Sequence, residues 1–232
     1  MKYTKTPSLF LVISLISVSL FSQTESDLAS WTSVQLGYEV DDNWDLGLEG
    51  QLRLKTNIST IDEYFTEFSV RRKLFKGFRL GLAARYIREN DNRGNIQGYE
   101  NHFRFHLDAN YKHRIGAIRI GYRLRYQNKN ELGVAQEEGD FAVNRLRFKT
   151  GLEYKIKNWP LDPELTGELF SRFEKNEASE LDKYRISLRT SYSLKKAGSL
   201  GVYYRVEGSI GEEIPEYQHI IGLKYKYVFS RQ

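Results

Sequence analysis

The sequence predicts an all-β protein: a single antiparallel up-and-down transmembrane β-barrel of 10–12 strands, preceded by a signal peptide. Three observations predict it. Apolar and polar residues alternate along most of the chain after residue 30, short and long connections follow one another in turn, and aromatic residues recur at a fixed spacing. The 232 residues fit one domain, and no linker-like stretch divides them.

The N-terminus has the three parts of a secretory signal peptide. Lys2 and Lys5 precede an apolar run over residues 9–21, and small or polar residues follow from Ser22. The alternative is a transmembrane helix, but such a helix needs about 20 apolar residues and this run is shorter. We therefore expect a signal peptide over residues 1–22, cleaved near Ser22 or Gln23, and an outer-membrane β-barrel over residues 23–232.

The composition excludes several other classes of protein. Charged residues make up 28% of the chain and the mean hydropathy is −0.57, which excludes a bundle of membrane helices. The aromatic share of 14% is high for an ordinary soluble domain. Cysteine is absent, which excludes disulfides and cysteine metal sites. The charges are dispersed along the chain, so we expect no nucleic-acid partner.

Strict alternation predicts the strands. Between residues 117 and 128, apolar side chains at 118, 120, 122 and 124 alternate with Arg119, Arg123 and Arg125, so one face of this strand is apolar and the other is charged. The same pattern recurs from end to end. The strands expected from it cover residues 30–40, 43–55, 63–75, 78–88, 99–112, 117–128, 141–157, 163–174, 183–195, 199–208 and 217–229.

The connections differ in kind. Tight ones are expected around residues 76–77, 114–116, 158–160 and 196–198, and longer polar ones at 89–98, 129–140, 175–182 and 209–216. Outer-membrane barrels separate short turns from long loops in this way, but those of bacteria have even strand numbers. The eleven segments therefore leave two alternatives: residues 30–40 lie outside the barrel wall, or a twelfth strand is missed.

Aromatic spacing favours lipid on the apolar face over a soluble barrel such as a lipocalin. Three strands carry aromatic residues eight positions apart, which in a tilted strand is a rise of roughly 20 Å, close to the separation of the aromatic girdles of membrane barrels. The expected girdle residues are Phe78, Tyr86, Phe103, Tyr111, Tyr184 and Tyr192.

The opposite face is expected to line the lumen with a network of arginines and carboxylates. Arginine is preferred over lysine there, which indicates crowded pairing through bidentate hydrogen bonds. The expected network comprises Arg53, Arg71, Arg85, Arg104, Arg123, Arg147, Arg189, Arg205, Glu49, Glu67, Asp108, Glu153, Glu168 and Glu207.

The last strand resembles the C-terminal signal read by the barrel-assembly machinery. Gly222, Tyr225, Tyr227 and Phe229 carry this resemblance, although three residues follow the terminal aromatic. This resemblance implies the barrel-assembly machinery as a partner during biogenesis. We also expect outer-membrane lipids as partners, and a monomeric barrel.

Across almost the whole mature chain, the sequence also resembles a family catalogued as domain of unknown function 2490, common in Bacteroidota. The resemblance is carried by residues 31–40 (WTSVQLGYEV), 43–53, 80–86 (LGLAARY), 123–126, 145–147 and 222–227 (GLKYKY). It implies a barrel in the outer membrane of a Gram-negative bacterium, and it brings no catalytic residues.

Catalytic, cofactor and metal sites are not expected. His102, His106, His113 and His219 are the only candidate bases, and no His-x-Ser-Asn-like motif accompanies them. The acidic pairs at residues 137–138 and 212–213 lie in expected loops, where solvation is the ordinary role.

Two classes of function therefore remain, with a third less favoured. The first is a structural or surface barrel whose lumen is largely filled by the arginine–glutamate network. The alternative is a narrow pore for small solutes with a weak preference for anions, because arginines outnumber acids inside. The third is an outer-membrane lipid-modifying hydrolase. Barrels of about eight strands are filled by side chains and those of 16–18 are open, so 10–12 strands favours the first.

Overall fold

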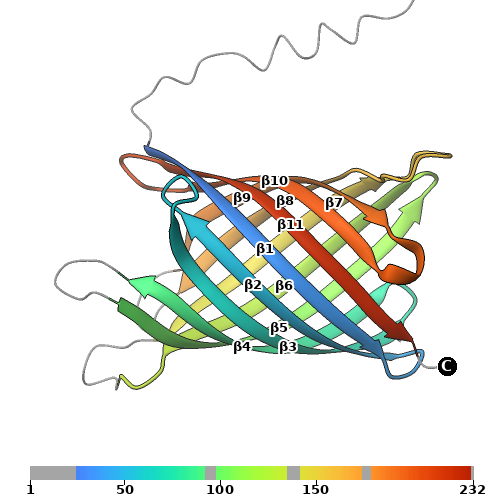
Figure 1. Cartoon of the computed structure of the whole chain (residues 1–232), viewed down its shortest axis with the longest axis horizontal. Coiled ribbons are helices and arrows are strands. Elements are labelled where there is room, and N and C mark those ends of the chain that lie inside the picture. The colour runs from blue at the N-terminus through green and yellow to red at the C-terminus, as the bar shows by residue number, and fades with distance from the viewer. Residues whose placement is uncertain (1–24, 92–97, 135–141, 174–178, 231–232) are drawn as a thin grey trace, which may run out of the picture.

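The computed structural model describes residues 25–91, 98–134, 142–173 and 179–230, which form one closed β-barrel (Figure 1). The predicted signal peptide lies outside the described residues. The eleven strands are β1 (Glu25–Glu39), β2 (Trp44–Lys55), β3 (Thr60–Phe75), β4 (Phe78–Asp91), β5 (Gly98–Ile115), β6 (Ile118–Glu131), β7 (Val143–Tyr154), β8 (Glu164–Phe173), β9 (Glu180–Ser193), β10 (Ser199–Ser209) and β11 (Glu216–Ser230).

Each strand corresponds to one of the eleven segments predicted by alternation. Residues 30–40 fall almost entirely in β1, which pairs with both β2 and β11, so the alternative that they lie outside the barrel wall is wrong. The described residues hold no twelfth strand. The connection around residues 158–160 was expected to be tight, but nine residues, 155–163, join β7 to β8.

One strand pair departs from the antiparallel prediction. β1 and β11 pair in parallel, from Glu25 opposite Glu216 to Glu39 opposite Ser230, whereas every other neighbouring pair is antiparallel. An odd number of strands in an up-and-down order requires this, because the first and last strands then run in the same direction. The barrel closes in the only way that eleven such strands allow.

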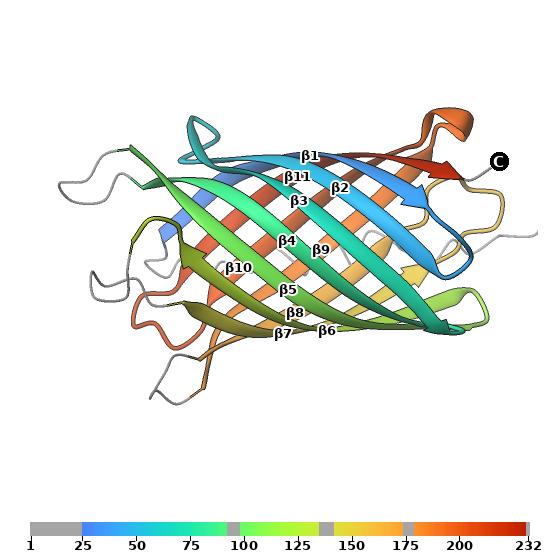
Figure 2. The ribbon, with the colours of Figure 1, turned by 90° about the horizontal axis from the view of Figure 1, so that it is seen from below.

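The two ends of the barrel differ in the connections that they carry (Figure 2). We call the end that carries the β2–β3, β4–β5, β6–β7, β8–β9 and β10–β11 connections the loop end, and the opposite end the turn end. Two of the turns, β3–β4 and β5–β6, have only two residues between the strands. Because β1 and β11 are parallel, β1 starts at the loop end and β11 finishes at the turn end (Figure 1).

The outer surface of the barrel is apolar and the inner surface is polar. Val34, Leu82, Leu107 and Leu188 point outward and are each 50–56% exposed. In the described part of the chain, the buried apolar side chains are few and all lie at inward positions, among them Trp31, Ile87 and Ile220. The described residues include no helix long and apolar enough to cross a bilayer.

Strand register aligns the predicted girdle residues on the outer surface. Phe78 on β4 lies opposite Tyr111 on β5 near the turn end, and Tyr86 lies opposite Phe103 near the loop end. On β9, Tyr192 lies near the turn end and Tyr184 near the loop end. Aromatic residues therefore stand near both ends of the apolar surface.

Candidate functional site

The lumen contains a cavity of about 900 Å³ that is lined by residues from all eleven strands. Its lining includes Glu89, Lys129 and Lys183 near the loop end. It also includes Arg119 and Asp162 near the turn end. The same cavity therefore reaches from the neighbourhood of one end of the barrel to that of the other.

Positive charge dominates this lining. Among the described residues that line the cavity are twelve arginines and five lysines, against ten carboxylates. The lumen is thus a polar interior with an excess of fixed cations.

All fourteen residues predicted for the lumen network lie at inward positions, and thirteen of them line this cavity. The remaining residue, Asp108, is not part of the lining but binds one that is. Its two carboxylate oxygens accept hydrogen bonds from Arg125 Nε and Nη2, at 2.6 and 2.7 Å. This is the bidentate geometry that a guanidinium offers to a carboxylate.

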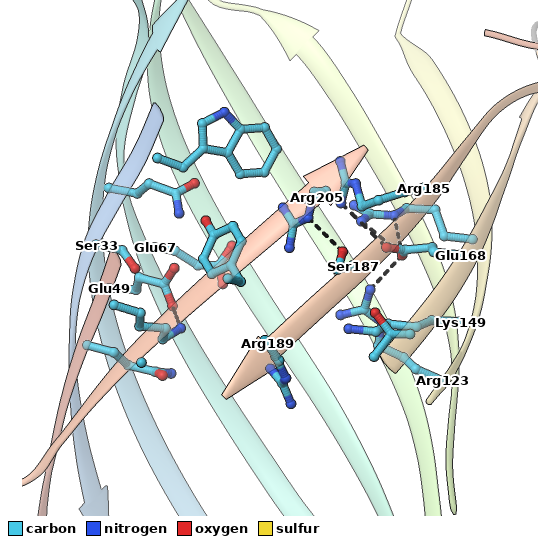
Figure 3. A pocket seen from close by; sticks show the side chains of 18 of the residues that line it. Ser33, Glu49, Glu67, Arg123, Lys149, Glu168, Arg185, Ser187, Arg189 and Arg205 are labelled. Carbon is cyan, nitrogen blue, oxygen red and sulfur yellow. Dashed lines mark hydrogen bonds and ion pairs between the residues drawn. The ribbon is translucent and has the colours of Figure 1, made fainter. Parts of the chain in front are cut away.

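Glu168 on β8 is the most heavily bonded carboxylate of the network. Its side chain is only 3% exposed and receives arginines from three other strands: Arg123 at 2.6 Å, Arg147 at 2.9 Å and Arg185 at 3.4 Å. Figure 3 shows Arg123 and Arg185 converging on it. Arg185 continues the network by pairing with Glu207 on β10.

Two further ion pairs lie in the lumen on β2, β3 and β4, away from Glu168. Arg85 on β4 binds Glu67 on β3 at 2.6 Å, and Arg53 on β2 binds Glu63 on β3 at 2.6 Å. These side chains are no more than 17% exposed, so the pairs are largely shielded from solvent. Each pair links neighbouring strands.

Inward-facing aromatic rings contact several of these guanidiniums. Arg53 and Arg205 lie over the Trp31 ring, at 3.7 and 4.8 Å from its centroid. Arg85 lies 3.3 Å from the Phe65 centroid. Similar contacts join Arg147 and Arg185 to Phe170, at 4.4 and 4.8 Å. A guanidinium over an aromatic face is attracted by the ring quadrupole.

Sequence reasoning missed these aromatic residues because it assigned apolar side chains to the outer face. The available signal was their position in the alternation, which places them on the same face as the polar inward residues. Phe65 stands between Glu63 and Glu67 at alternate positions, so it shares their inward face. Trp31, Phe170 and Tyr203 are likewise in step with polar inward residues of their own strands.

Gly222 allows one of these rings to lie against the wall. It sits on β11 between Trp31 on β1 and Tyr203 on β10, and a Cβ atom there would come within 1.8 Å of the Tyr203 ring. The other residues of the predicted assembly signal face outward. Tyr225 donates a hydrogen bond to the Ala197 carbonyl, and the rings of Tyr227 and Phe229 meet edge to face.

The histidines divide between the two faces. His106 is 3% exposed in the lumen and lies 3.9 Å from both Glu67 and Asp108, and His102 lies 3.3 Å from Glu100. On the outer face, His113 stacks between Tyr111 and Tyr122, and His219 hydrogen-bonds to Tyr204. No group of three or more metal-binding side chains was found within the described ranges.

Sequence comparison places the chain in a family. Residues 28–207 match the model of a family described as Protein of unknown function (DUF2490). No curated protein matches the chain. The match covers most of β1, all of β2 to β9 and most of β10. The chain therefore belongs to the DUF2490 family.

Proposed function

We propose that this protein is an outer-membrane barrel that forms a narrow, water-filled channel with a preference for small anions. One observation carries the proposal: a single cavity is lined from near the loop end to near the turn end, and cations outnumber carboxylates in that lining. Rings of arginine and lysine are the means by which pores select anions and phosphate. Ion preference then follows from fixed charge rather than from pore diameter alone.

The outer surface supports the membrane location. Leucine and valine side chains are half-exposed all around the barrel, and a soluble protein rarely exposes so continuous an apolar surface. A closed barrel pairs the backbone amides of its strands internally, as a bilayer requires. The N-terminal segment that resembles a signal peptide supports export. Fractionation of cells should place the protein with the outer membrane, and the folded form should migrate differently from the boiled form on a gel.

The fixed charges are held by their partners. Three arginines share Glu168, and aromatic rings fix other guanidiniums against the wall, so these groups cannot fold away from the passage. Arg71, Lys149 and Lys226 also line the cavity, and none of them forms an ion pair with a carboxylate among the residues that the structure describes. Asp45 lies opposite Arg71 and Glu168 lies opposite Lys149 on the neighbouring strands, but these acids are paired with other arginines.

The second candidate is a structural barrel with a filled lumen. The observation that favours it is the burial of Arg85, Arg147 and Glu168, each at most 7% exposed, because such packed side chains narrow the passage. The two candidates make opposite predictions for ion flow.

Recording from the purified, folded protein in a planar lipid bilayer separates them. The channel predicts discrete, reproducible current steps in symmetrical KCl. The filled barrel predicts no steps above the bilayer baseline, although the same preparation passes the gel-shift test for folding. Activity on lipids would show as fatty acid released from lipid vesicles that contain the purified, folded protein, and that result would favour the hydrolase instead.

A further inference from the structure

Three cations stand side by side across three strands on the loop-end half of the lumen. Arg85 on β4 lies directly opposite Arg104 on β5, and Arg104 lies directly opposite Lys129 on β6. All three line the cavity. Like charges directly opposite one another on a sheet are destabilising, so this row requires compensation.

Carboxylates compensate only the two outer members of the row. Arg85 binds Glu67, and Lys129 binds Glu89. Arg104 has no ion-pair partner among the described residues. Glu63 and Glu67 are within electrostatic reach of Arg104, but they are engaged by Arg53 and Arg85. The central guanidinium therefore keeps its charge uncompensated at short range.

Arg85 and Arg104 each have a buried nitrogen that donates no hydrogen bond. Arg85 is 6% exposed, and its Nε and Nη2 both bond to Glu67, which leaves Nη1 buried without a hydrogen-bond partner. Arg104 Nε is buried without a partner as well. Leaving a buried donor unpaired lowers the stability of the fold, and the cost is greater for a charged group. Two such donors on register neighbours are the arrangement that a ligand with several acceptor oxygens would complete.

The wall holds Arg85 in place for this role. Its guanidinium lies 3.3 Å from the Phe65 centroid, and Glu67 fixes one edge of it. A planar fork already oriented in this way loses little rotational freedom when it binds an oxyanion. We propose that Arg85 and Arg104 form a binding site for a small oxyanion, a carboxylate or a phosphate, within the lumen. The proposal rests on the proposed channel, because it presumes that anions enter the lumen.

Calorimetric titration of the full-length folded protein in detergent tests the site without requiring conduction. Inorganic phosphate and acetate are titrated separately, with chloride as the background anion, and whichever binds more tightly identifies the class of oxyanion. We expect saturable binding at one site per barrel. Arg104→Gln should weaken it at least about tenfold, because a charge-assisted hydrogen bond and a positive charge are lost. Arg104→Lys, which keeps the charge but not the fork, should recover only part of the affinity.

Lys226→Gln is the matched control. It removes the same charge from the lumen lining, but on β11 near the turn end, and it should leave the affinity within about twofold of wild type. The gel shift of each variant establishes that the barrel is folded before titration. The site is refuted if neither anion gives saturable binding to the wild type, or if Arg104→Gln and Lys226→Gln weaken binding equally. A barrel that binds phosphate but passes no current would instead refute the channel and leave the site standing.

Discussion

At the scale of single residues, the lumen shows how an arginine-rich interior can be stable. Each of the arginines that meet at Glu168 would be costly to bury alone, and the shared carboxylate reduces that cost. The Phe170 ring contacts two of these guanidiniums, those of Arg147 and Arg185. Charge and aromatic surface thus act on the same groups, and the loss of the carboxylate would expose all three to mutual repulsion.

Glu168→Gln should therefore lower the free energy of unfolding by about 3–5 kcal/mol, the usual effect of removing one partner from a buried ion pair. Urea unfolding in detergent, followed by tryptophan fluorescence and gel shift, measures it. Glu153→Gln is the control, because its partner Arg119 is 40% exposed and such pairs contribute at most about 1 kcal/mol. Equal losses from the two variants would contradict the role given to Glu168.

Gly222→Ala should destabilise the barrel by about 1–3 kcal/mol, because the added Cβ overlaps the Tyr203 ring. Gly50→Ala on β2 is the control, since a Cβ there meets nothing within 4 Å. In a Tyr203→Ala background, the cost of Gly222→Ala should largely disappear, and the same unfolding assay completes this double-mutant cycle. An unchanged cost in that background would show that the ring is not the obstacle.

At the scale of elements, the sequence predicted the strands well because alternation is a local signal. The inward positions of Arg53, Arg85 and Glu168 followed from the same period of two. The parallel pairing of β1 with β11 did not, because it joins segments nearly 200 residues apart and depends on the total number of strands. The ion-pair partners were also beyond prediction, because they depend on register between strands.

Parallel closure has a consequence for the proposed membrane orientation. If the loop end faces the cell exterior, the start of β1 faces the exterior too, while β11 finishes on the periplasmic side. Antiparallel closure would have put the start of β1 and the finish of β11 on the same side. The position of the N-terminal end of β1 therefore reports directly on the closure.

Single cysteines can locate that end, since the chain contains no cysteine of its own. Ser26→Cys should react in intact cells with a maleimide too large to cross the outer membrane, as should Ile214→Cys in the β10–β11 connection. Ala117→Cys in the β5–β6 turn should react only after the membrane is permeabilised. Labelling of Ser26→Cys that follows the pattern of Ala117→Cys would contradict the parallel closure.

At the scale of the whole molecule, the barrel combines an apolar outer surface with a lumen of excess positive charge. Barrel size alone does not decide between a filled interior and a passage, because eleven strands lie between the filled and the open barrels. We base the proposed passage on the cavity lining, and the proposed preference for anions on the excess of cations in that lining. Such a preference should weaken as salt screens the fixed charges.

The zero-current potential across a bilayer that contains the wild-type barrel, measured between concentrated and dilute KCl, tests this account most directly. A channel that prefers anions passes chloride faster than potassium, so the dilute side should become negative relative to the concentrated side. The potential should shrink toward zero in the combined variant Arg71→Gln, Lys149→Gln and Lys226→Gln. A dilute side that becomes positive, or a folded barrel that passes no current, would contradict the anion channel.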